Sequence, residues 1–311
     1  RKQSADELAL ATYNVENLAL SDSDTKFARL AAGVVTNLAC PDIIALEEIQ
    51  DNDGVTDDGM VAADATVQKF IAAIKASQGP TYDWRSINPQ NDADGGQPGG
   101  NIRQVLLFNP ARVSFIDIPG GDATTPVGVT EVEGKARLTA SPGRIAPQDP
   151  AWNRSRKPLV SQFTFHGRTV FVIADHFAAK LGDQDFEGRF QPPNRSSEVQ
   201  RVEQSKIEND FVKQLLASDE QADIVVLGDL NDFQFSPAVL TLTAGGALRD
   251  LIDSLPSAER YSYVYEGNSQ VLDHILVSSA VRRCDYEVVH INAEFAHQTS
   301  DHDPQVVRIQ P

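Results

Sequence analysis

Sulfur-containing residues are scarce in this sequence, which has two cysteines and one methionine among its 311 residues. Two thiols are too few for a thiolate cluster, and the dispersed histidines show no pair at the spacing of a helical zinc site. The sequence therefore argues against zinc. Cys40 and Cys284 are compatible with reduced thiols in a cytoplasm or with a single bridge in a secreted protein, and both states stay open.

Long apolar runs are also missing, since no stretch of about 18 apolar residues occurs, and we expect no membrane span. No signal peptide is visible, yet the chain begins with Arg1 instead of methionine, which predicts a processed or trimmed protein that could have lost one. Scarce sulfur, many aspartates and an acidic balance favour an exported bacterial protein, extracellular or periplasmic. A cytoplasmic location is not excluded.

Positive charge is the third shortage, with 27 basic against 44 acidic residues, a net charge of −17 and a pI near 4.7. This balance argues against long-range attraction of nucleic acid. The charge is uneven, however, because residues 42–64 hold eight acidic and no basic residues, whereas residues 135–168 hold seven basic residues and one acidic residue. The basic stretch is either a positive wall beside a substrate or a solvated loop.

What the sequence does contain is a set of short polar segments, each beside an apolar, β-favouring run. They are residues 14–17, 47–48, 175–176, 228–232 and 301–302. Carboxylates, amides and imidazoles held at strand ends suit a divalent metal and a phosphate ester. A single segment of this kind is equally typical of a polar turn, so the interpretation depends on reading the segments together.

Two of the segments show how such groups can be arranged. Neighbouring side chains on an extended backbone point to opposite faces, so that one of Asp301 and His302 can bind metal while the other addresses water. Asp229 and Asn231 follow an apolar run and lie on one face if the chain stays extended. Asp229 could orient a nucleophilic water or polarise a leaving oxygen, and Asn231 could donate to a phosphoryl oxygen.

Six motifs between Tyr13 and Pro304 carry a resemblance to a known family. They are Tyr13-Asn14-Val15-Glu16-Asn17-Leu18, Ala45-Leu46-Glu47-Glu48-Ile49-Gln50, Ala174-Asp175-His176-Phe177, Gly228-Asp229-Leu230-Asn231-Asp232, Leu272-Asp273-His274-Ile275-Leu276-Val277 and Ser300-Asp301-His302-Asp303-Pro304. In this order they resemble the endonuclease/exonuclease/phosphatase superfamily, which includes pancreatic-type deoxyribonucleases, abasic-site endonucleases, sphingomyelinases and inositol polyphosphate 5-phosphatases. One motif is weak evidence, but six in the family's order are specific.

The resemblance implies a metal site. Glu48 looks like the central metal ligand, and Asn14, Glu16 and Asp301 would complete or support the shell of the cation. Glu47 falls where related sequences often carry glutamine, so its role stays open. Carboxylate and amide oxygens favour Mg²⁺ or Mn²⁺, with Ca²⁺ as a further candidate.

The resemblance also implies a set of catalytic side chains. His302 looks like the base that takes a proton from the attacking water, and Asp273 looks like the carboxylate that orients and stabilises its ring. Asp229 and Asn231 would handle the nucleophile and the phosphoryl oxygens. His176 matches a second histidine of the deoxyribonuclease branch, which faces the scissile phosphate and protonates or stabilises the leaving oxygen.

Several basic residues are further candidates. Arg103 starts a strand after a glycine-rich loop, where relatives often place a phosphate-contacting side chain. Lys180 and the run 154–157 could reach a flanking phosphate. For each of them, a solvent-exposed cation without a substrate role is the alternative.

Periodicity and turn signals predict the secondary structure. Helices are expected at residues 24–38, 62–76 and 196–215, where apolar residues recur at helical spacing. Strands are expected at residues 8–13, 41–46, 84–87, 104–108, 112–116, 159–165, 169–174, 222–227, 261–265, 271–277, 286–291 and 305–309. This pattern fits an α/β protein, and the resemblance implies a four-layer α/β sandwich of two packed mixed β-sheets flanked by helices.

The expected site draws on both ends of the chain, so we favour one catalytic domain over residues 1–311, either monomeric or part of a larger multidomain chain. Long loops at residues 88–100, 119–152 and 182–194 are expected to ring a substrate groove. The leading hypothesis is a metal-dependent phosphodiesterase that hydrolyses nucleic acid, with DNA preferred. The alternatives are a phosphatase or lipid phosphodiesterase of the same superfamily, or a noncatalytic binding protein on that fold.

Overall fold

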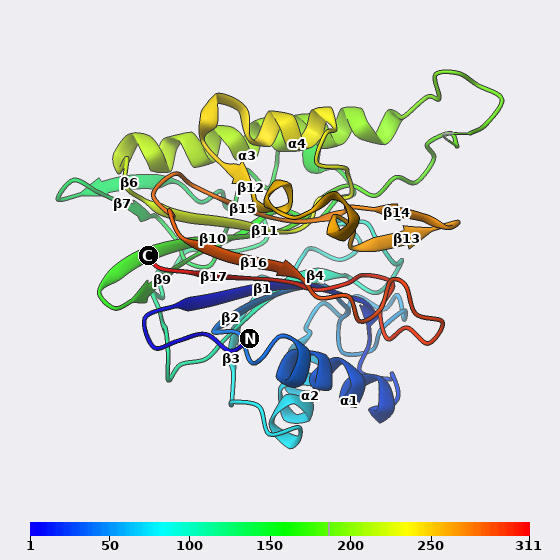
Figure 1. Ribbon diagram of the computed structural model, residues 1–311, viewed down its shortest axis with the longest axis horizontal. Helices are drawn as coiled ribbons and strands as arrows, with labels where there is room; N and C mark the ends of the chain where they lie inside the picture. Colours follow the sequence, from blue (N-terminus) through cyan, green and yellow to red (C-terminus); the bar gives the residue numbers. More distant parts are fainter. Residues whose placement is uncertain (186) are drawn as a thin grey trace.

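The structure, a computed structural model, describes residues 1–185 and 187–311. Two β-sheets pack face to face, and helices cover the outer face of each sheet, so that the chain forms four layers (Figure 1). The first sheet has the strand order β16-β17-β1-β2-β4-β3, and the second has the order β12-β15-β11-β10-β9-β5, with β8 also pairing with β9. Both sheets contain parallel and antiparallel pairs. The predicted four-layer α/β sandwich is confirmed.

The strands have the following bounds. The first sheet comprises β1 (Leu8–Leu18), β2 (Ile43–Ile49), β3 (Asp83–Arg85), β4 (Arg103–Phe108), β16 (Cys284–Val288) and β17 (Gln305–Ile309). The second comprises β5 (Ser114–Phe115), β8 (Gly143–Arg144), β9 (Leu159–Phe165), β10 (Arg168–His176), β11 (Asp223–Asp229), β12 (Arg249–Asp250) and β15 (Asp273–Val277). Two hairpins lie outside the large sheets, namely β6 (Val129–Val132) with β7 (Lys135–Leu138), and β13 (Tyr263–Tyr265) with β14 (Asn268–Gln270).

The helices lie on the two outer faces. They are α1 (Asp24–Ala32), α2 (Asp64–Ala76), α3 (Ser196–Ser218) and α4 (Pro237–Leu242), with short helical turns η1 (Gly33–Asn37), η2 (Pro150–Trp152), η3 (Ala244–Gly246), η4 (Leu251–Ser254) and η5 (Ser257–Glu259). The first sheet is covered by α1 and α2, and the second by α3 and α4 (Figure 1).

Strand β1 shows how the sequence builds these layers. Side chains alternate along a strand, so Leu8 and Leu10 face the core between the two sheets, while Tyr13 and Val15 face the core beneath α1 and α2. All four residues are buried. A strand that lies between two apolar layers needs apolar residues on both faces, and the nearly continuous apolar run of β1 meets this need.

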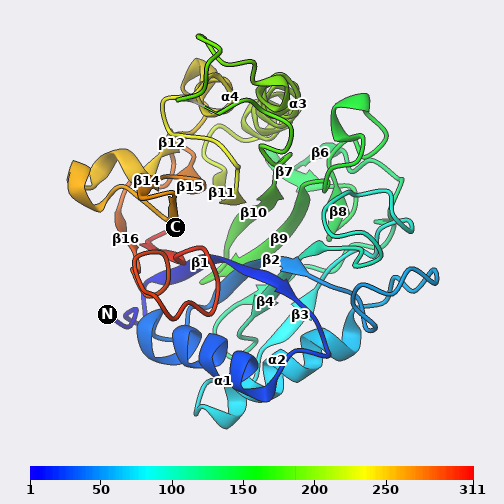
Figure 2. The same cartoon turned by 90° about the vertical axis from the view of Figure 1, so that its right-hand side faces the viewer.

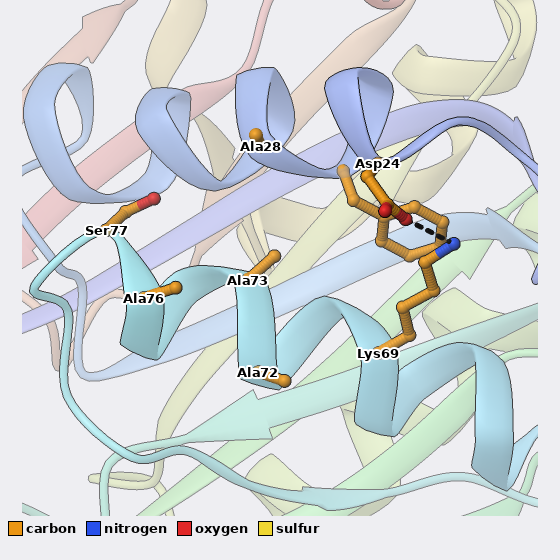
Figure 3. A pocket seen from close by; sticks show the side chains of 8 residues that line it. Asp24, Ala28, Lys69, Ala72, Ala73, Ala76 and Ser77 are labelled. Carbon is orange, nitrogen blue, oxygen red and sulfur yellow. Dashed lines mark ion pairs between the residues drawn. The ribbon is translucent and has the colours of Figure 1, made fainter.

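The helix predicted at residues 24–38 divides into two parts. Its N-terminus is capped by Ser23, whose Oγ accepts a hydrogen bond from the Lys26 backbone N–H at 3.1 Å. After Ala32 the chain changes to the wider π-helical turn η1. Helices α1 and α2 pack side by side, and Lys69 joins them through an ion pair with Asp24 at 3.0 Å (Figure 3).

The predicted loop at residues 119–152 is the largest error of the sequence analysis. It contains the β6–β7 hairpin and the short strand β8, and the hairpin contacts α3. Buried Val127, Leu138 and Ile145 join the core beneath α3. The predicted strand 112–116 is reduced to the two residues of β5. Residue 186 of the predicted loop 182–194 lies outside the described residues.

Two further expectations from the sequence concern a disulfide bridge and a membrane-spanning helix. Cys40 and Cys284 are both free thiols, so the structure does not contain the bridge that the sequence left open. Within residues 1–185 and 187–311, no helix combines the length and apolarity that crossing a bilayer requires.

Candidate active site

Three predicted site residues lie side by side because of the strand register of the second sheet. His176 pairs with Asp229 across the parallel strands β10 and β11, and Asp229 pairs with Asp273 across the antiparallel strands β11 and β15. The C-terminal ends of β1, β2, β10 and β11 lie at one end of the sandwich, which faces the viewer in Figure 2. Polar residues that are far apart in the sequence therefore meet at this edge.

Gly228 allows strand β11 to approach β10 closely, and this approach places Asp229 at the edge of the sheet. Its φ is 149°, and a Cβ at this position would lie 2.1 Å from the carbonyl oxygen of Asp175 on the neighbouring strand. Any other residue would push the two strands apart. The glycine thus keeps Asp229 beside His176.

His302 and Asp273 form a buried acid–imidazole pair. His302 Nδ1 lies 2.7 Å from Asp273 Oδ2, which also accepts a hydrogen bond from Ser262 Oγ at 2.7 Å. Burial alone would lower the pKa of His302, but the carboxylates of Asp273 and Asp229 outweigh it and hold the pKa well above its ordinary value. The other ring nitrogen, Nε2, lies 3.7 Å from Asp229 Oδ2. Asp273 therefore orients the ring through Nδ1, and Nε2 faces the site.

His176 has the opposite electrostatic environment. Its Nε2 lies 3.6 Å from Asp229 Oδ2 and 3.8 Å from Glu48 Oε1. Burial, followed by the charges of Arg156 and His302, lowers the pKa of His176 well below its ordinary value. This imidazole is therefore neutral at physiological pH, and it can offer a hydrogen bond or a lone pair without a change of charge.

Asp229 lies between the two histidines. Its Oδ2 accepts a hydrogen bond from Asn14 Nδ2 at 3.1 Å, and its Oδ1 accepts one from the Asn231 backbone N–H at 2.8 Å. Burial is the main cause that raises the pKa of Asp229 to about 7, and the Asp273 carboxylate adds to it. Asn231 donates from Nδ2 to the Phe177 carbonyl at 3.2 Å. The site thus holds a carboxyl group, that of Asp229, whose pKa lies near neutrality.

Of the predicted metal ligands, Asn14 and Glu48 are in contact at the ends of β1 and β2, whereas Glu16 and Asp301 interact with Glu48 through their charges. Glu48 Oε1 accepts a hydrogen bond from Asn14 Nδ2 at 3.1 Å, and Glu48 Oε2 accepts one from the Asn17 backbone N–H at 2.9 Å. Glu16 and Glu48 have φ values of 50° and 63°, in the left-handed region, as strands β1 and β2 turn at the site. A strained backbone at two carboxylates is typical of a site where position matters more than local stability.

The pKa shifts of the acidic residues indicate whether the site suits a cation. Burial raises the pKa of Glu16 and of Asp301, and the charge of Glu48 raises both further. Glu48, His176 and Asp229 each offer a ligand atom within 4.8 Å of one another, and Asp229, Asp273 and His302 do the same. Carboxylates that repel one another in a partly buried space are stabilised by a divalent cation, so the residues fit the implied metal.

A family model described as the Endonuclease/Exonuclease/phosphatase family matches residues 11–302. The chain belongs to this family. Members of the endonuclease/exonuclease/phosphatase family are hydrolases that act on phosphate ester bonds and use divalent metals, and this chain is an enzyme of that class. No protein of the curated set matches the sequence.

Solved structures of the family share the fold at low sequence identity. D. rerio TDP2 complexed with a single strand DNA product has a TM-score of 0.59 and 15% identity, covering 98% of this chain and 99% of that one. The human Nocturnin catalytic domain with a bound sulfate anion has a TM-score of 0.60 and 13% identity, covering 98% and 94%. A family protein from Bacteroides thetaiotaomicron has a TM-score of 0.55 and 17% identity, covering 97% and 94%.

The structure contradicts the prediction that Arg103 contacts a phosphate. Its side chain is 1% exposed, and its guanidinium donates to the carbonyls of Asn101 and Val61 and to Asn88 Oδ1. The sequence located Arg103 correctly at the start of a strand, but it could not show that the side chain points into the protein. Arg103 supports the loop 88–101 from within.

The basic stretch 135–168 is divided between buried and exposed charges, so it is not simply a solvated loop. Arg144 and Lys157 are buried and both pair with Asp94, at 2.9 and 2.5 Å. Arg168 pairs with Asp223 at 2.8 Å. Three of the seven basic residues, Arg144, Arg156 and Lys157, are therefore buried, whereas Lys135, Arg137, Arg154 and Arg168 are exposed.

Arg156 is the site residue that sequence reasoning did not single out. It is buried, its Nη2 donates to the Phe177 carbonyl at 2.7 Å, and its charge acts on His176, Glu48 and Asp229. Its Nε has no hydrogen-bond partner among the described residues. The signal was the basic run 154–157, but the pattern could not show that only Arg156 reaches this edge of the sheet.

Lys180 keeps its predicted place beside the site. Its Nζ donates to the Asn231 carbonyl at 2.6 Å and to Asp232 Oδ1 at 3.0 Å, and a quarter of the side chain stays exposed. Asp232, a motif residue without a predicted role, also accepts from Arg201 Nε at 2.9 Å. These contacts hold Lys180 next to Asn231, and a role in substrate binding stays a prediction.

Proposed function

We propose that this enzyme is a nuclease, which hydrolyses the phosphodiester bonds of nucleic acid and acts on DNA. The observation that carries the proposal is the meeting of Glu48, Asp229 and His302 at one edge, linked through Asn14 and Asp273. The likeness to TDP2 with a DNA product adds support, since that protein has the same fold and a nucleic acid in its site.

In this proposal His302 is the general base. Its Nε2 faces Asp229 and takes a proton from water when the ring is in its neutral form, while Asp273 holds Nδ1 and stabilises the imidazolium that forms. Asp229 orients the water between the two histidines. His176, which is neutral, donates a hydrogen bond to the leaving oxygen, and Asn231 binds a phosphoryl oxygen.

Glu48, Asn14, Glu16 and Asp301 would hold the divalent cation, and we propose Mg²⁺ or Mn²⁺, because these oxygen donors suit hard cations. Bound there, the cation would neutralise charge on a nonbridging phosphoryl oxygen. Glu48 is central because both its oxygens already accept hydrogen bonds that fix its orientation.

The test is a plasmid-nicking assay with the purified protein, with Mg²⁺ or Mn²⁺ added after chelation. Conversion of supercoiled plasmid to open circles, lost on chelation and restored by either ion, is the expected result. A Glu48→Gln variant should require a higher metal concentration for the same rate. Absence of cleavage of both the plasmid and a single-stranded oligonucleotide with Mg²⁺, Mn²⁺ and Ca²⁺, alone or combined, would refute the nuclease assignment.

A further inference from the structure

Two exposed aromatic side chains lie near the reaction centre, although burying such rings away from water is favourable. Phe235 is 69% exposed and Tyr265 is 52% exposed. Each lies two residues beyond a partly buried aromatic residue, Phe233 or Tyr263, that is close to a site residue. The two pairs come from different parts of the chain, the segment after β11 and the β13–β14 hairpin.

The first pair continues directly from the catalytic motif. The Phe233 and Phe235 rings stack with centroids 5.4 Å apart and planes inclined by 28°. Lys180 Nζ lies 4.6 Å from the centroid of the Phe233 ring while it donates to the carbonyl of Asn231. A cation beside stacked rings at a phosphate-handling residue is the combination that binds a nucleotide, because the cation meets the phosphate and the ring meets the base.

The second pair lies beside His302. The Tyr263 ring contacts the His302 ring, with centroids 4.9 Å apart, and the backbones of the two residues form a β-bridge. Tyr265 lies on the same face of strand β13, because side chains alternate along a strand. Since Tyr263 faces the site, Tyr265 continues that face outward into solvent. The hairpin projects from the site end of the sandwich (Figure 1).

We propose that these two pairs are base-stacking platforms for single-stranded nucleic acid, one beside Lys180 and Asn231 and one beside His302. This inference rests on the proposed nuclease function and specifies its substrate. A duplex keeps its bases stacked on one another, so only an unpaired strand can place bases on the rings of Phe235 and Tyr265. Stacking also supplies affinity that does not depend on positive charge, which this protein of net charge −17 lacks.

The pattern of the two segments favours a nucleic acid over a lipid surface. The aromatic residues alternate with other residues in Phe233-Gln234-Phe235 and Tyr263-Val264-Tyr265, and acidic Asp232 and Glu266 flank them. Insertion into a bilayer requires a continuous apolar surface and disfavours carboxylates at its edge. Single rings with polar neighbours suit bases, which offer flat faces and polar edges.

The experiment measures binding of a fluorescent single-stranded oligonucleotide by anisotropy, in a His302→Ala background that prevents cleavage. Phe235→Ala and Tyr265→Ala should each weaken binding by about 10-fold, the loss expected for one stacked base. Leu240→Ala is the matched control, since it truncates another apolar side chain, 57% exposed on α4, and should leave the affinity unchanged. Phe235→Trp should retain the wild-type affinity.

Two further ligands separate stacking from other causes. An oligonucleotide of abasic residues has the same backbone charge and no bases, and it should bind weakly and equally to the parent and to both alanine variants. The duplex of the same sequence should bind more weakly than the single strand. Equal binding of single strand and duplex, or an unchanged affinity in both alanine variants, would overturn the platforms.

The last part of the experiment measures binding of the protein to vesicles of phosphatidylcholine and sphingomyelin. No sedimentation of the protein with them is expected, and sedimentation that Phe235→Ala abolishes would assign the rings to a lipid surface instead. Failure of the platforms is distinguishable from failure of the nuclease function. In the first case wild-type protein still nicks plasmid, whereas in the second neither plasmid nor oligonucleotide is cut.

Discussion

The two histidines beside Asp229 are chemically identical and equally hidden from solvent, but they occupy opposite electrostatic environments. His302 is paired with Asp273, and carboxylates raise its pKa, whereas His176 lies near Arg156, and burial and positive charge lower its pKa. A high pKa suits a group that must accept a proton, and a low pKa suits a group that donates a hydrogen bond while neutral. The comparison shows that the surrounding charges, and not the residue type, divide the roles.

The largest effect on activity is expected when His302, the proposed general base, is removed. His302→Ala removes the only group that we assign to take the proton from water, and it should lower kcat by about 10⁴-fold. Circular dichroism and the melting temperature should show that the fold is retained. His297→Ala is the matched control, because His297 lies exposed on the preceding loop. Equal rates in the two variants would remove His302 from the mechanism.

A smaller but more informative effect is expected for Asp273→Asn. The variant keeps the shape of the site and removes the charge that raises the pKa of His302. We expect kcat to fall by about 10²-fold, and the acid limb of the kcat/KM profile to move to lower pH, because a less basic His302 loses its proton earlier. Both the rate and the profile are measured by cleavage assays across the pH range.

Asp250→Asn is the control for that variant. Asp250 pairs with His274 at 2.6 Å in a buried acid–imidazole pair that does not belong to the proposed site. Its removal should leave the acid limb in place. A shift of the limb in both variants would show that general loss of buried charge, and not the orientation of His302, sets the profile.

His176→Gln tests the other half of the comparison. Glutamine retains a hydrogen-bond donor but cannot titrate, so the variant should lose less activity than Asp273→Asn, about 10-fold in kcat. Because His176 is already neutral, the acid limb should not move. Movement of the limb to the same extent as in Asp273→Asn would contradict the division of roles.

The smallest effect concerns the stability of the fold and involves two buried acidic residues behind His176. Asp175 on β10 and Glu208 on α3 are fully buried, burial raises the pKa of Asp175 to about 7, and burial together with the charge of Asp175 raises the pKa of Glu208 well above its ordinary value. The folded chain therefore holds protons that the unfolded chain releases near pH 4. The stability that these protons provide is fully present at low pH and is lost as the pH rises through 7.

The double variant Asp175→Asn/Glu208→Gln replaces this pair by two amides that can hydrogen-bond without titrating. Its free energy of unfolding should fall less than that of wild type between pH 5 and pH 8, by roughly 2 kcal/mol. Urea unfolding at several pH values measures the difference. Asp117→Asn, at an exposed carboxylate, should follow wild type. Parallel curves for wild type and the double variant would refute the raised pKa values of Asp175 and Glu208.

The sequence predicted the parts of this site that depend on strand order. Carboxylates and histidines at the ends of apolar runs were recognisable, and Glu48, Asp229, Asp273 and His302 indeed lie together. Strand ends of a sheet meet at its edge whatever the details of side-chain packing, so such residues can be read from pattern alone.

The rest depends on contacts between distant segments. By sequence, Arg103 and Arg156 are both in positions from which they could reach a substrate phosphate. In the structure Arg103 donates to backbone carbonyls of a loop, whereas Arg156 reaches the edge of the sheet beside His176. The partner of each buried cation is set by tertiary packing, as for Asp94 with Arg144 and Lys157. Similarly, the β6–β7 hairpin is stabilised by its contact with α3, which local periodicity does not report.

The pairing of β17 with β1 has a consequence for biosynthesis. His302 lies shortly before β17, which joins the sheet between β16 and β1, the first strand of the chain. A polypeptide that is stalled on the ribosome or cleaved before residue 302 contains Glu48 and Asp229 but lacks the base. Such fragments are expected to be unable to cut phosphodiesters while the polypeptide is still being made.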